Sequence, residues 1–261
     1  MIGLIAGGGE LPILFLNNAK EDVVTVALTG DAGSGIKRHA RKIYWERVGN
    51  VNKIIKIFKK EKIKKISMTG KVNKINVFLG IKPNLRTLRI IMSLKDGKDT
   101  TLLSRFISEF EKEGIKVVSP LIYLKGLLAK KGILTRRKPT VREMQDIKFG
   151  FPIAKKLADM DIGQAVVVKN KMVLAVEAIE GTDEAIMRGG KLGKNSSVCV
   201  KAARTKQDLR MDIPGIGVNT IMSLKKANIP CIAIESKKIL IANEEKVIKL
   251  AERLNICIVS V

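Results

Sequence analysis

The chain contains few histidine, cysteine and aromatic residues, and each shortage excludes a class of protein. Its 261 residues include one histidine, His39, and aromatic residues make up 4% of the total. One histidine cannot form a two-histidine zinc site or a histidine relay, and His39 lies in a basic stretch without metal-ligand spacing. We expect a solvated loop residue there. The low aromatic content argues against a protein that stacks on nucleic-acid bases.

The three cysteines follow no disulfide or metal-binding pattern. Cys199, Cys231 and Cys257 each lie inside an apolar run that is rich in β-branched residues. This context is typical of small buried thiols.

Long apolar runs are absent as well. No apolar run reaches 18 residues, so the sequence predicts no transmembrane helix. Residues 1–6 lead directly into glycines, without the basic start and cleavage site of a signal peptide. We therefore expect a cytoplasmic protein.

Positive charge is what the chain has in excess. It has 49 Lys and Arg against 25 Asp and Glu, which gives a net charge of +24. Such a field attracts nucleic acids, anionic lipid surfaces and phosphorylated substrates. A lysine-rich, solvated surface is the alternative explanation.

The length allows two domains, and the first half predicts a Rossmann-like parallel sheet with flanking helices. Apolar runs alternate with amphipathic segments, as in sheets whose strands are joined by crossover helices. We expect strands at 2–6, 23–28, 66–69 and 117–118, and helices at 11–18, from the Asn50 cap onward, and at 100–112.

The second half predicts a mixed α/β domain. A capping box, Thr140 to Glu143, opens its first helix, and Asn170-Lys171 separates two apolar runs as a hairpin turn does. The charged segment before it, 130–139, is poor in apolar residues and predicts a linker. We therefore expect an N-terminal domain at 1–129 and a C-terminal catalytic domain at 140–261.

Three clusters could carry chemistry, and the first is the glycine turn Gly7, Gly8 and Gly9 between a strand and a helix. Bare backbone N–H groups at a helix start bind phosphate well. The spacing is not the dinucleotide fingerprint G-x-G-x-x-G, so a tight turn without a ligand is the alternative.

The second cluster is acidic and lies where an apolar strand ends and a helix begins. Some of its carboxylates, such as Glu180 and Asp183, could serve only to complement the helix dipole. Glu177 directly follows the strand, where a carboxylate is often anchored to another group.

The third cluster, 201–217, mixes cations with Asp208, Asp212 and the turn Pro214-Gly215. Magnesium is usually held by one or two carboxylates and substrate phosphates, while Arg and Lys neutralise the remaining phosphate charge. With one histidine in the chain, a carboxylate or a metal would activate water. Together the clusters indicate a phosphate ester or pyrophosphate substrate, and a charged surface loop is the alternative.

In its motifs the sequence resembles the UDP-2,3-diacylglucosamine pyrophosphatases of the LpxI type, enzymes of lipid A biosynthesis. The matching motifs are GLIAGGGELP (3–12), TGKV (69–72), LLSRFISEFEKEGIKV (102–117), DIGQAVVV (161–168), LAVEAIEGTDEAIMR (174–188) and QDLRMDIPGIG (207–217). The resemblance implies magnesium-assisted hydrolysis of the substrate to 2,3-diacylglucosamine 1-phosphate (lipid X) and UMP. It also implies two domains with a crevice between them, and leans toward a homodimer.

The resemblance assigns roles to individual residues. The aspartate that the family needs falls on Asp212, which we expect to bind the metal or orient the water. Gln207, Asp208 and Arg210 would line the same catalytic site. The expected substrate-binding residues are Gly7, Gly8, Gly9, Glu177, Glu180, Thr182, Asp183 and Lys201. A diacylated substrate lies in an anionic membrane leaflet. We therefore expect the lysines also to bind the protein peripherally to the inner membrane face.

The chain departs from the family's usual motif at 204–206, 215 and 236–237. Action on another UDP-linked lipid or sugar is therefore an alternative function. The net charge leaves a nucleic-acid-binding protein as a second alternative, and the glycine turn leaves a nucleotide-dependent oxidoreductase as a third.

Overall fold

The computed structural model describes residues 1–72, 99–211 and 213–261, and the chain divides into two compact units. Unit 1 contains Met1–Lys125 together with Asp208–Asp212, and unit 2 contains Gly126–Gln207 and Ile213–Val261. The chain therefore enters unit 1 a second time, through a short segment of its C-terminal half.

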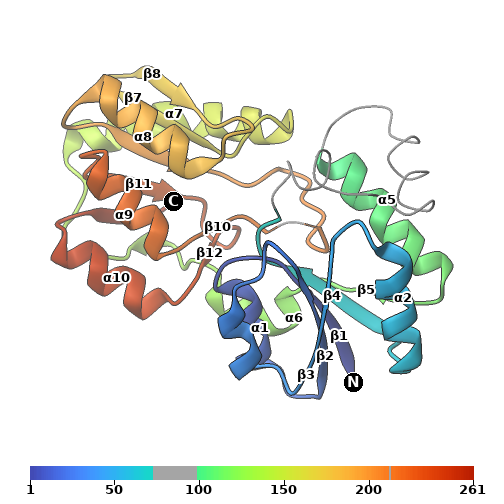
Figure 1. The fold of residues 1–261 in the computed structure, drawn as a ribbon. Coiled ribbons are helices and arrows are strands. Elements are labelled where there is room, and N and C mark those ends of the chain that lie inside the picture. Colours follow the sequence, from blue (N-terminus) through green and yellow to red (C-terminus); the bar gives the residue numbers. More distant parts are fainter. Residues whose placement is uncertain (73–98, 212) are drawn as a thin grey trace. The chain divides into compact units, whose positions relative to one another are not determined.

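Unit 1 contains a five-stranded parallel sheet (Figure 1). Its strands are β1 (Ile2–Ala6), β2 (Val23–Leu28), β3 (Lys42–Glu46), β4 (Lys65–Thr69) and β5 (Lys116–Val117). The order β3-β2-β1-β4-β5, with every pair parallel, is the doubly wound Rossmann order and confirms the predicted fold class. The edge strand β3 was not among the expected strands.

The helices of unit 1 are α1 (Leu11–Asn18), α2 (Val51–Lys60), α5 (Asp99–Lys112) and α6 (Leu121–Leu124), with a 3-10 turn at Ser34–Arg38. A second 3-10 turn, Lys125–Leu127, spans the boundary between the units. The predicted apolar faces of α2 and α5 are buried in one core with residues of the strands. Phe15 of α1 meets Tyr123 of α6 edge to face, with ring centroids 5.0 Å apart. Asn50 stands at the start of α2, but its side chain donates to Glu46 Oε2 and caps no helix N–H, so the predicted side-chain cap is wrong.

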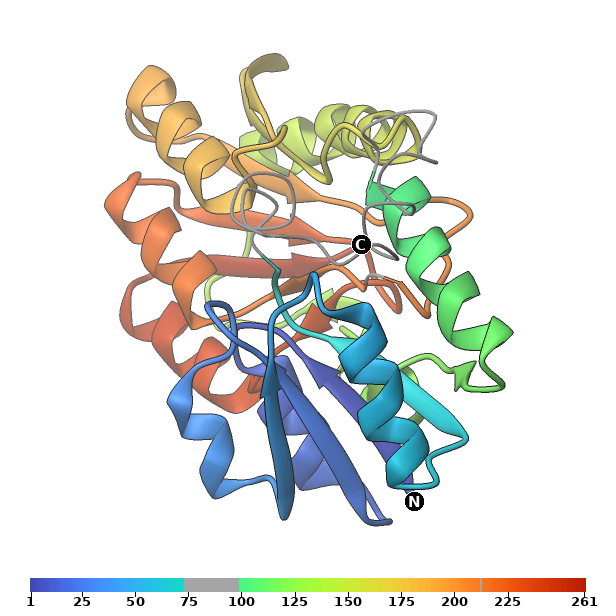
Figure 2. The same cartoon turned by 45° about the vertical axis from the view of Figure 1, so that its right-hand side comes forward.

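Unit 2 contains a six-stranded mixed sheet in the order β6-β13-β11-β9-β7-β8 (Figure 2). The strands are β6 (Gly132–Ile133), β7 (Ala165–Lys169), β8 (Met172–Val176), β9 (Val198–Lys201), β11 (Cys231–Ile234) and β13 (Cys257–Ser260). Strands β9, β11 and β13 are parallel, whereas β6 and β7 run against their neighbours. A small second sheet pairs β10 (Gly215–Ile216) with β12 (Leu240–Ile241). This architecture confirms the predicted mixed α/β fold.

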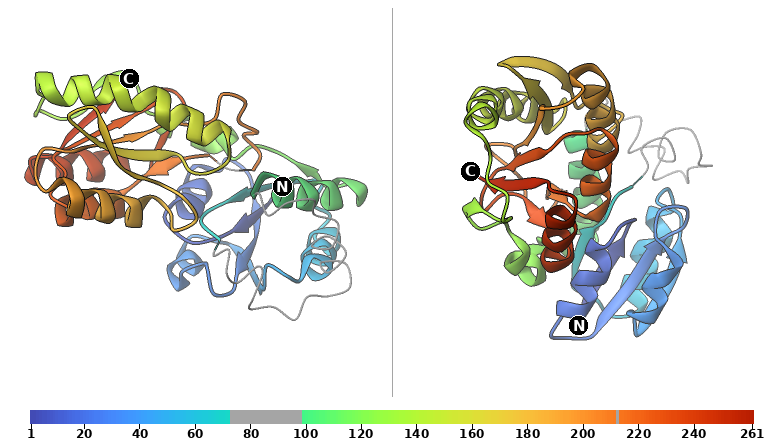
Figure 3. Two further views of the ribbon diagram at one scale, coloured as in Figure 1. Left: turned by 90° about the horizontal axis from the view of Figure 1, so that it is seen from above. Right: turned by 90° about the vertical axis from the view of Figure 1, so that its left-hand side faces the viewer.

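Helices cover both faces of this sheet. Helix α7 (Val141–Asp159) packs on one face, and α8 (Thr182–Gly193), α9 (Val218–Lys226) and α10 (Glu244–Arg253) pack on the other (Figure 3). The capping box is confirmed, because the Glu143 N–H donates to Thr140 Oγ1 and the Thr140 N–H donates to Glu143 Oε2. The predicted hairpin is confirmed too, with Asn170 and Lys171 at φ of 50° and 57° between β7 and β8.

Two expectations about single residue types are also met. All three cysteines are free and buried. His39 is exposed, and its Nδ1 lies 2.8 Å from Asn17 Oδ1. No helix among the described residues is long and apolar enough to cross a membrane.

Candidate active site

The carboxyl ends of parallel strands are where open α/β sheets bind their ligands. In unit 2, β9 ends at Lys201, and Glu235 directly follows the neighbouring strand β11. Strand β8 runs parallel to β9, because β7 is antiparallel to both, and Glu177 follows its last residue. Sheet topology therefore brings residues of the second and third clusters to one edge of this sheet.

Lys201, the last residue of β9, connects polar side chains at this edge of the sheet. Its side chain is 6% exposed, and its Nζ donates to Thr182 Oγ1 at 2.6 Å and lies 3.9 Å from Glu177 Oε2. The Thr182 hydroxyl in turn donates to Glu177 Oε1 at 2.9 Å, and the Gln164 N–H donates to the other carboxylate oxygen. A buried ammonium group is tolerated because it is paired and hydrogen-bonded. Three predicted substrate-binding residues therefore form one connected group.

Two local features build this group. Gly163 packs against the backbone of Glu177, just after β8. A Cβ on Gly163 would lie 2.1 Å from the Glu177 carbonyl oxygen. The glycine of the DIGQ motif is thus required by a close backbone approach. Gly181 has φ of 86° and turns the chain into α8, which places Thr182 at the first helical position.

Asp183 and Glu180 differ in their surroundings. Burial raises the pKa of the Cys199 thiol to about 12, and the charges of Lys201, Glu177 and Asp183 all act on it. Asp183 lies in the first turn of α8, directly after Thr182. Glu180 instead pairs with Arg188, which also donates to a carbonyl oxygen of β8.

The loop after β9 is held by side chains that the sequence analysis did not select. Glu235 accepts the Ala203 N–H at 2.9 Å and two hydrogen bonds from Lys155 Nζ, at 2.8 and 3.0 Å. These residues are 80 and 32 positions apart in sequence. No local signal marks such a contact, so pattern reading alone could not find it.

The next turn of this loop is fixed by two aspartates at the end of α7. Arg204 pairs with Asp161, the first residue of the DIGQ motif. Asp159 accepts hydrogen bonds from the Thr205 N–H at 2.7 Å and the Thr205 hydroxyl at 2.8 Å, and these bonds lower the pKa of Asp159. The structure therefore favours a fixed loop over a solvated one.

The glycine turn of unit 1 has less free backbone than the sequence suggested. The Gly7 N–H donates to Thr69 O at 2.9 Å, and the Gly8 N–H donates to Lys71 O at 2.7 Å. A Cβ at Gly7 would lie 2.5 Å from Lys71 O, so this glycine serves the close packing of two backbone segments. The prediction of bare N–H groups is wrong for Gly7 and Gly8. Gly9 has φ of 90° and open space around its Cα.

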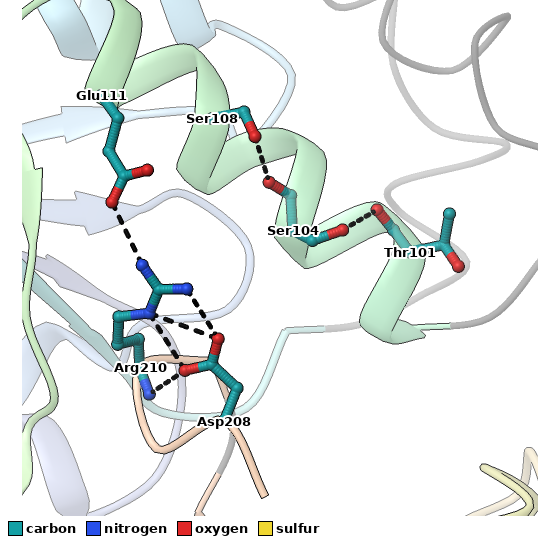
Figure 4. Close-up of polar contacts among 6 residues, drawn as sticks. All are labelled: Thr101, Ser104, Ser108, Glu111, Asp208 and Arg210. Carbon is teal, nitrogen blue, oxygen red and sulfur yellow. Dashed lines mark hydrogen bonds and ion pairs between the residues drawn. The ribbon is translucent and has the colours of Figure 1, made fainter.

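Asp208 and Arg210 form an ion pair in unit 1 (Figure 4). The guanidinium donates to both carboxylate oxygens, with Nη2 2.8 Å from Oδ2 and Nε 3.0 Å from Oδ1. Its Nη1 lies 3.1 Å from Oε1 of Glu111 on α5. The hydrogen bonds from Arg210 hold the pKa of Asp208 below its ordinary value.

Three of the four predicted catalytic residues lie among the described residues. Asp208 and Arg210 contact each other, whereas Gln207 belongs to unit 2, where its Oε1 accepts the Arg204 N–H at 3.3 Å. Asp212, predicted as catalytic residue and metal ligand, lies outside the described residues.

A magnesium site was tested against the donors present. Among the described residues, no group of three or more His, Cys, Asp or Glu side chains is placed to hold a metal ion. Both oxygens of Asp208 accept hydrogen bonds from Arg210. Magnesium is usually held by one or two carboxylates when substrate phosphates complete its shell, and the predicted ligand, Asp212, lies outside the described residues.

Two surface cavities of unit 2, of about 350 and 630 Å³, lie against α10. Their lining includes Arg137, Lys249 and Arg253, but no residue of the predicted site. We therefore assign the site from contacts at the sheet edge and not from these cavities.

Two comparisons with known proteins agree with each other. Residues 1–127 match the family model described as the LpxI N-terminal domain, and residues 130–259 match that described as the LpxI C-terminal domain. A protein of Caulobacter vibrioides named UDP-2,3-diacylglucosamine pyrophosphatase LpxI is 30% identical over 275 residues. That alignment covers 100% of this chain and 97% of the Caulobacter protein.

Proposed function

Because the chain belongs to the LpxI family, we propose that it hydrolyses the pyrophosphate bond of UDP-2,3-diacylglucosamine and releases lipid X and UMP. The observation that carries this proposal is the full-length match to the Caulobacter protein named for that activity. Both domain models match, so the likeness includes each of the two units. Hydrolysis of this substrate would serve lipid A biosynthesis.

The connected group at the sheet edge of unit 2 supports an ordered polar site. Lys201 is nearly buried, and its Nζ donates to Thr182 Oγ1 and lies 3.9 Å from Glu177 Oε2. Retaining a buried charge is costly unless its partners are placed well, and such groups cluster at functional sites. In our proposal Lys201 and the N-terminal end of α8 offset the Glu177 carboxylate and keep this group ordered for substrate binding.

Magnesium is part of the proposed reaction. Asp212 and the substrate's phosphate oxygens would hold the ion, which would neutralise charge on the pyrophosphate and favour ionisation of water. Asp208 pairs with Arg210 through both of its oxygens, and the metal contact is assigned to Asp212. Removal of divalent ions with EDTA should abolish turnover and added Mg²⁺ should restore it. Undiminished turnover in EDTA would contradict this part.

A substrate panel tests the function itself. The native chain is incubated with UDP-2,3-diacylglucosamine, with UDP-N-acetylglucosamine and with a UDP-linked lipid of another sugar, and UMP is measured. We expect UMP from the diacylated substrate alone. UMP from one of the other two, and none from the diacylated one, would favour the second candidate function, hydrolysis of a different UDP-linked compound.

One observation favours testing the second candidate function, hydrolysis of a different UDP-linked compound. Two of the residues at which this chain departs from the family motif, Arg204 and Thr205, are fixed by contacts with Asp161 and Asp159. These two departures therefore lie in a loop that follows Lys201 and contacts the end of α7, where they can affect which substrate is accepted.

The net charge of +24 supports a further part of the proposal, reversible binding to anionic membranes. Vesicles containing anionic phospholipid should co-sediment the protein at low salt and release it at high salt, because salt screens exposed charges. Equal binding to neutral and anionic vesicles at low salt would contradict it.

A further inference from the structure

We propose that Glu111 is a positioning residue that acts through Arg210, and that Arg210 holds the segment Asp208–Met211 in place instead of binding the substrate's phosphates. This proposal rests on the proposed function, since the segment is part of the motif QDLRMDIPGIG. It differs from the expectation that Arg210 belongs to the catalytic site as a phosphate ligand.

The first step is the location of the segment. It comes from the C-terminal half of the chain, yet its contacts place it in unit 1. Met211 packs against the core in which Phe106 of α5 and Phe58 of α2 are buried. Within the segment, the Arg210 N–H donates to Asp208 Oδ1 at 3.0 Å and the Met211 N–H donates to Asp208 O at 3.1 Å. The segment is thus a tight turn with an apolar anchor.

The second step is the state of the Arg210 guanidinium. All three of its nitrogens are engaged by carboxylates, Nε and Nη2 by Asp208 and Nη1 by Glu111 (Figure 4). One positive charge therefore faces two negative charges. A phosphate oxygen that approached this group would meet net negative charge, so Arg210 is a poor ligand for it. Through the same contacts, the Arg210 guanidinium links Asp208 to α5.

The third step is the place of Glu111 on its helix. Thr101, Ser104, Ser108 and Glu111 follow one another at helical spacing along one face of α5 (Figure 4). The Ser104 and Ser108 hydroxyls donate to carbonyl oxygens of the preceding turn, at 2.8 and 3.0 Å. Glu111 instead reaches a residue 99 positions away in sequence. The Glu111 carboxylate therefore connects this face of α5 to the segment Asp208–Met211.

Enzyme kinetics test the link. Glu111→Gln removes the charge and keeps the shape. Because the side chains of Arg210 and Glu111 are 39% and 43% exposed, we expect a fall of about two- to fivefold in kcat. Arg210→Gln also releases Asp208 and should lower kcat about tenfold or more. KM should stay unchanged in both, because neither side chain binds the ground-state substrate.

A double variant decides whether Glu111 acts through Arg210. Adding Glu111→Gln to Arg210→Gln should cause no further loss. The matched control is Glu113→Gln, on the residue just after the same helix, which pairs with Lys59 and should behave as the native protein does. Additive losses would overturn the proposal. So would a large rise in KM for Arg210→Gln with kcat unchanged, since that is the behaviour of a phosphate ligand.

Hydrogen exchange tests the same link without any substrate. In Glu111→Gln the amides of Arg210 and Met211 should exchange about two- to fivefold faster than in the native protein, and in Glu113→Gln they should not. Unchanged exchange in Glu111→Gln would overturn the proposal whatever the activity. If the native protein fails to release UMP while exchange behaves as expected, the proposed function is wrong and the positioning contact stands.

Discussion

At the residue scale the proposed site depends on Lys201, whose ammonium group is nearly buried between Thr182 and Glu177. An isolated buried charge would be strongly destabilising, so each member of this group needs the others. All three residues could be selected from the sequence, Glu177 for its position after an apolar strand, Lys201 as part of the third cluster and Thr182 through a family motif. The sequence could not show that they touch, since a strand, a turn and a helix separate them.

Replacing Lys201 with Met tests this dependence. The substitution keeps most of the side-chain volume but leaves the Glu177 carboxylate without its cation. We expect the free energy of unfolding to fall by about 3 kcal/mol and turnover to fall with it. Urea denaturation measures the first and UMP release the second. Lys148→Met, on an exposed position of α7, is the matched control and should change neither. Native-like stability of Lys201→Met would contradict the assigned pairing.

The cysteines provide a second prediction at this scale. Cys199, Cys231 and Cys257 are fully buried, and burial raises the pKa of Cys199 to about 12. Because all three thiols are inaccessible to solvent, none should react with a disulfide reagent at pH 8 in the native protein, and three should react in denaturant. A thiol that reacts rapidly in the native protein would show that its strand is accessible.

At the scale of single elements, amphipathic periodicity and turn chemistry predicted most helices and strands. The α2 and α5 faces, the capping box and the β7–β8 hairpin all follow from local residue order. Strand β3 does not, because its residues, KIYWE, are only partly buried and charged at both ends. It lies at the sheet edge, where one side of its backbone is unpaired within this sheet and a weak apolar pattern suffices.

The capping box of α7 supplies the prediction for this scale. Thr140 Oγ1 accepts the Glu143 N–H, and Glu143 in turn accepts from the Thr140 N–H and from Arg137. Thr140→Ala should lower the free energy of unfolding by about 1 kcal/mol, because one helix N–H loses its acceptor. Thr140→Ser keeps the hydroxyl and should stay close to the native value. Equal stability of the two variants in urea would show that the cap contributes nothing.

For the whole molecule, alternation of strands and helices predicted a parallel first half and a mixed second half, and both are observed. The assignment of Asp208–Met211 to unit 1 was beyond reach, because no local pattern tells which core a short charged loop will join. The side chains that decide it, Met211 on an apolar core and Arg210 on Glu111, contact residues far away in the sequence.

The central claim is that this chain is a magnesium-assisted pyrophosphatase of the LpxI family whose essential carboxylate is Asp212. The most direct measurement is UMP release from UDP-2,3-diacylglucosamine with Mg²⁺, by the native protein and by Asp212→Ala. Steady turnover by the native protein and a loss of about a hundredfold or more in the folded variant is the predicted result. No turnover by folded native protein would contradict the function, and native-like turnover by Asp212→Ala would contradict the site.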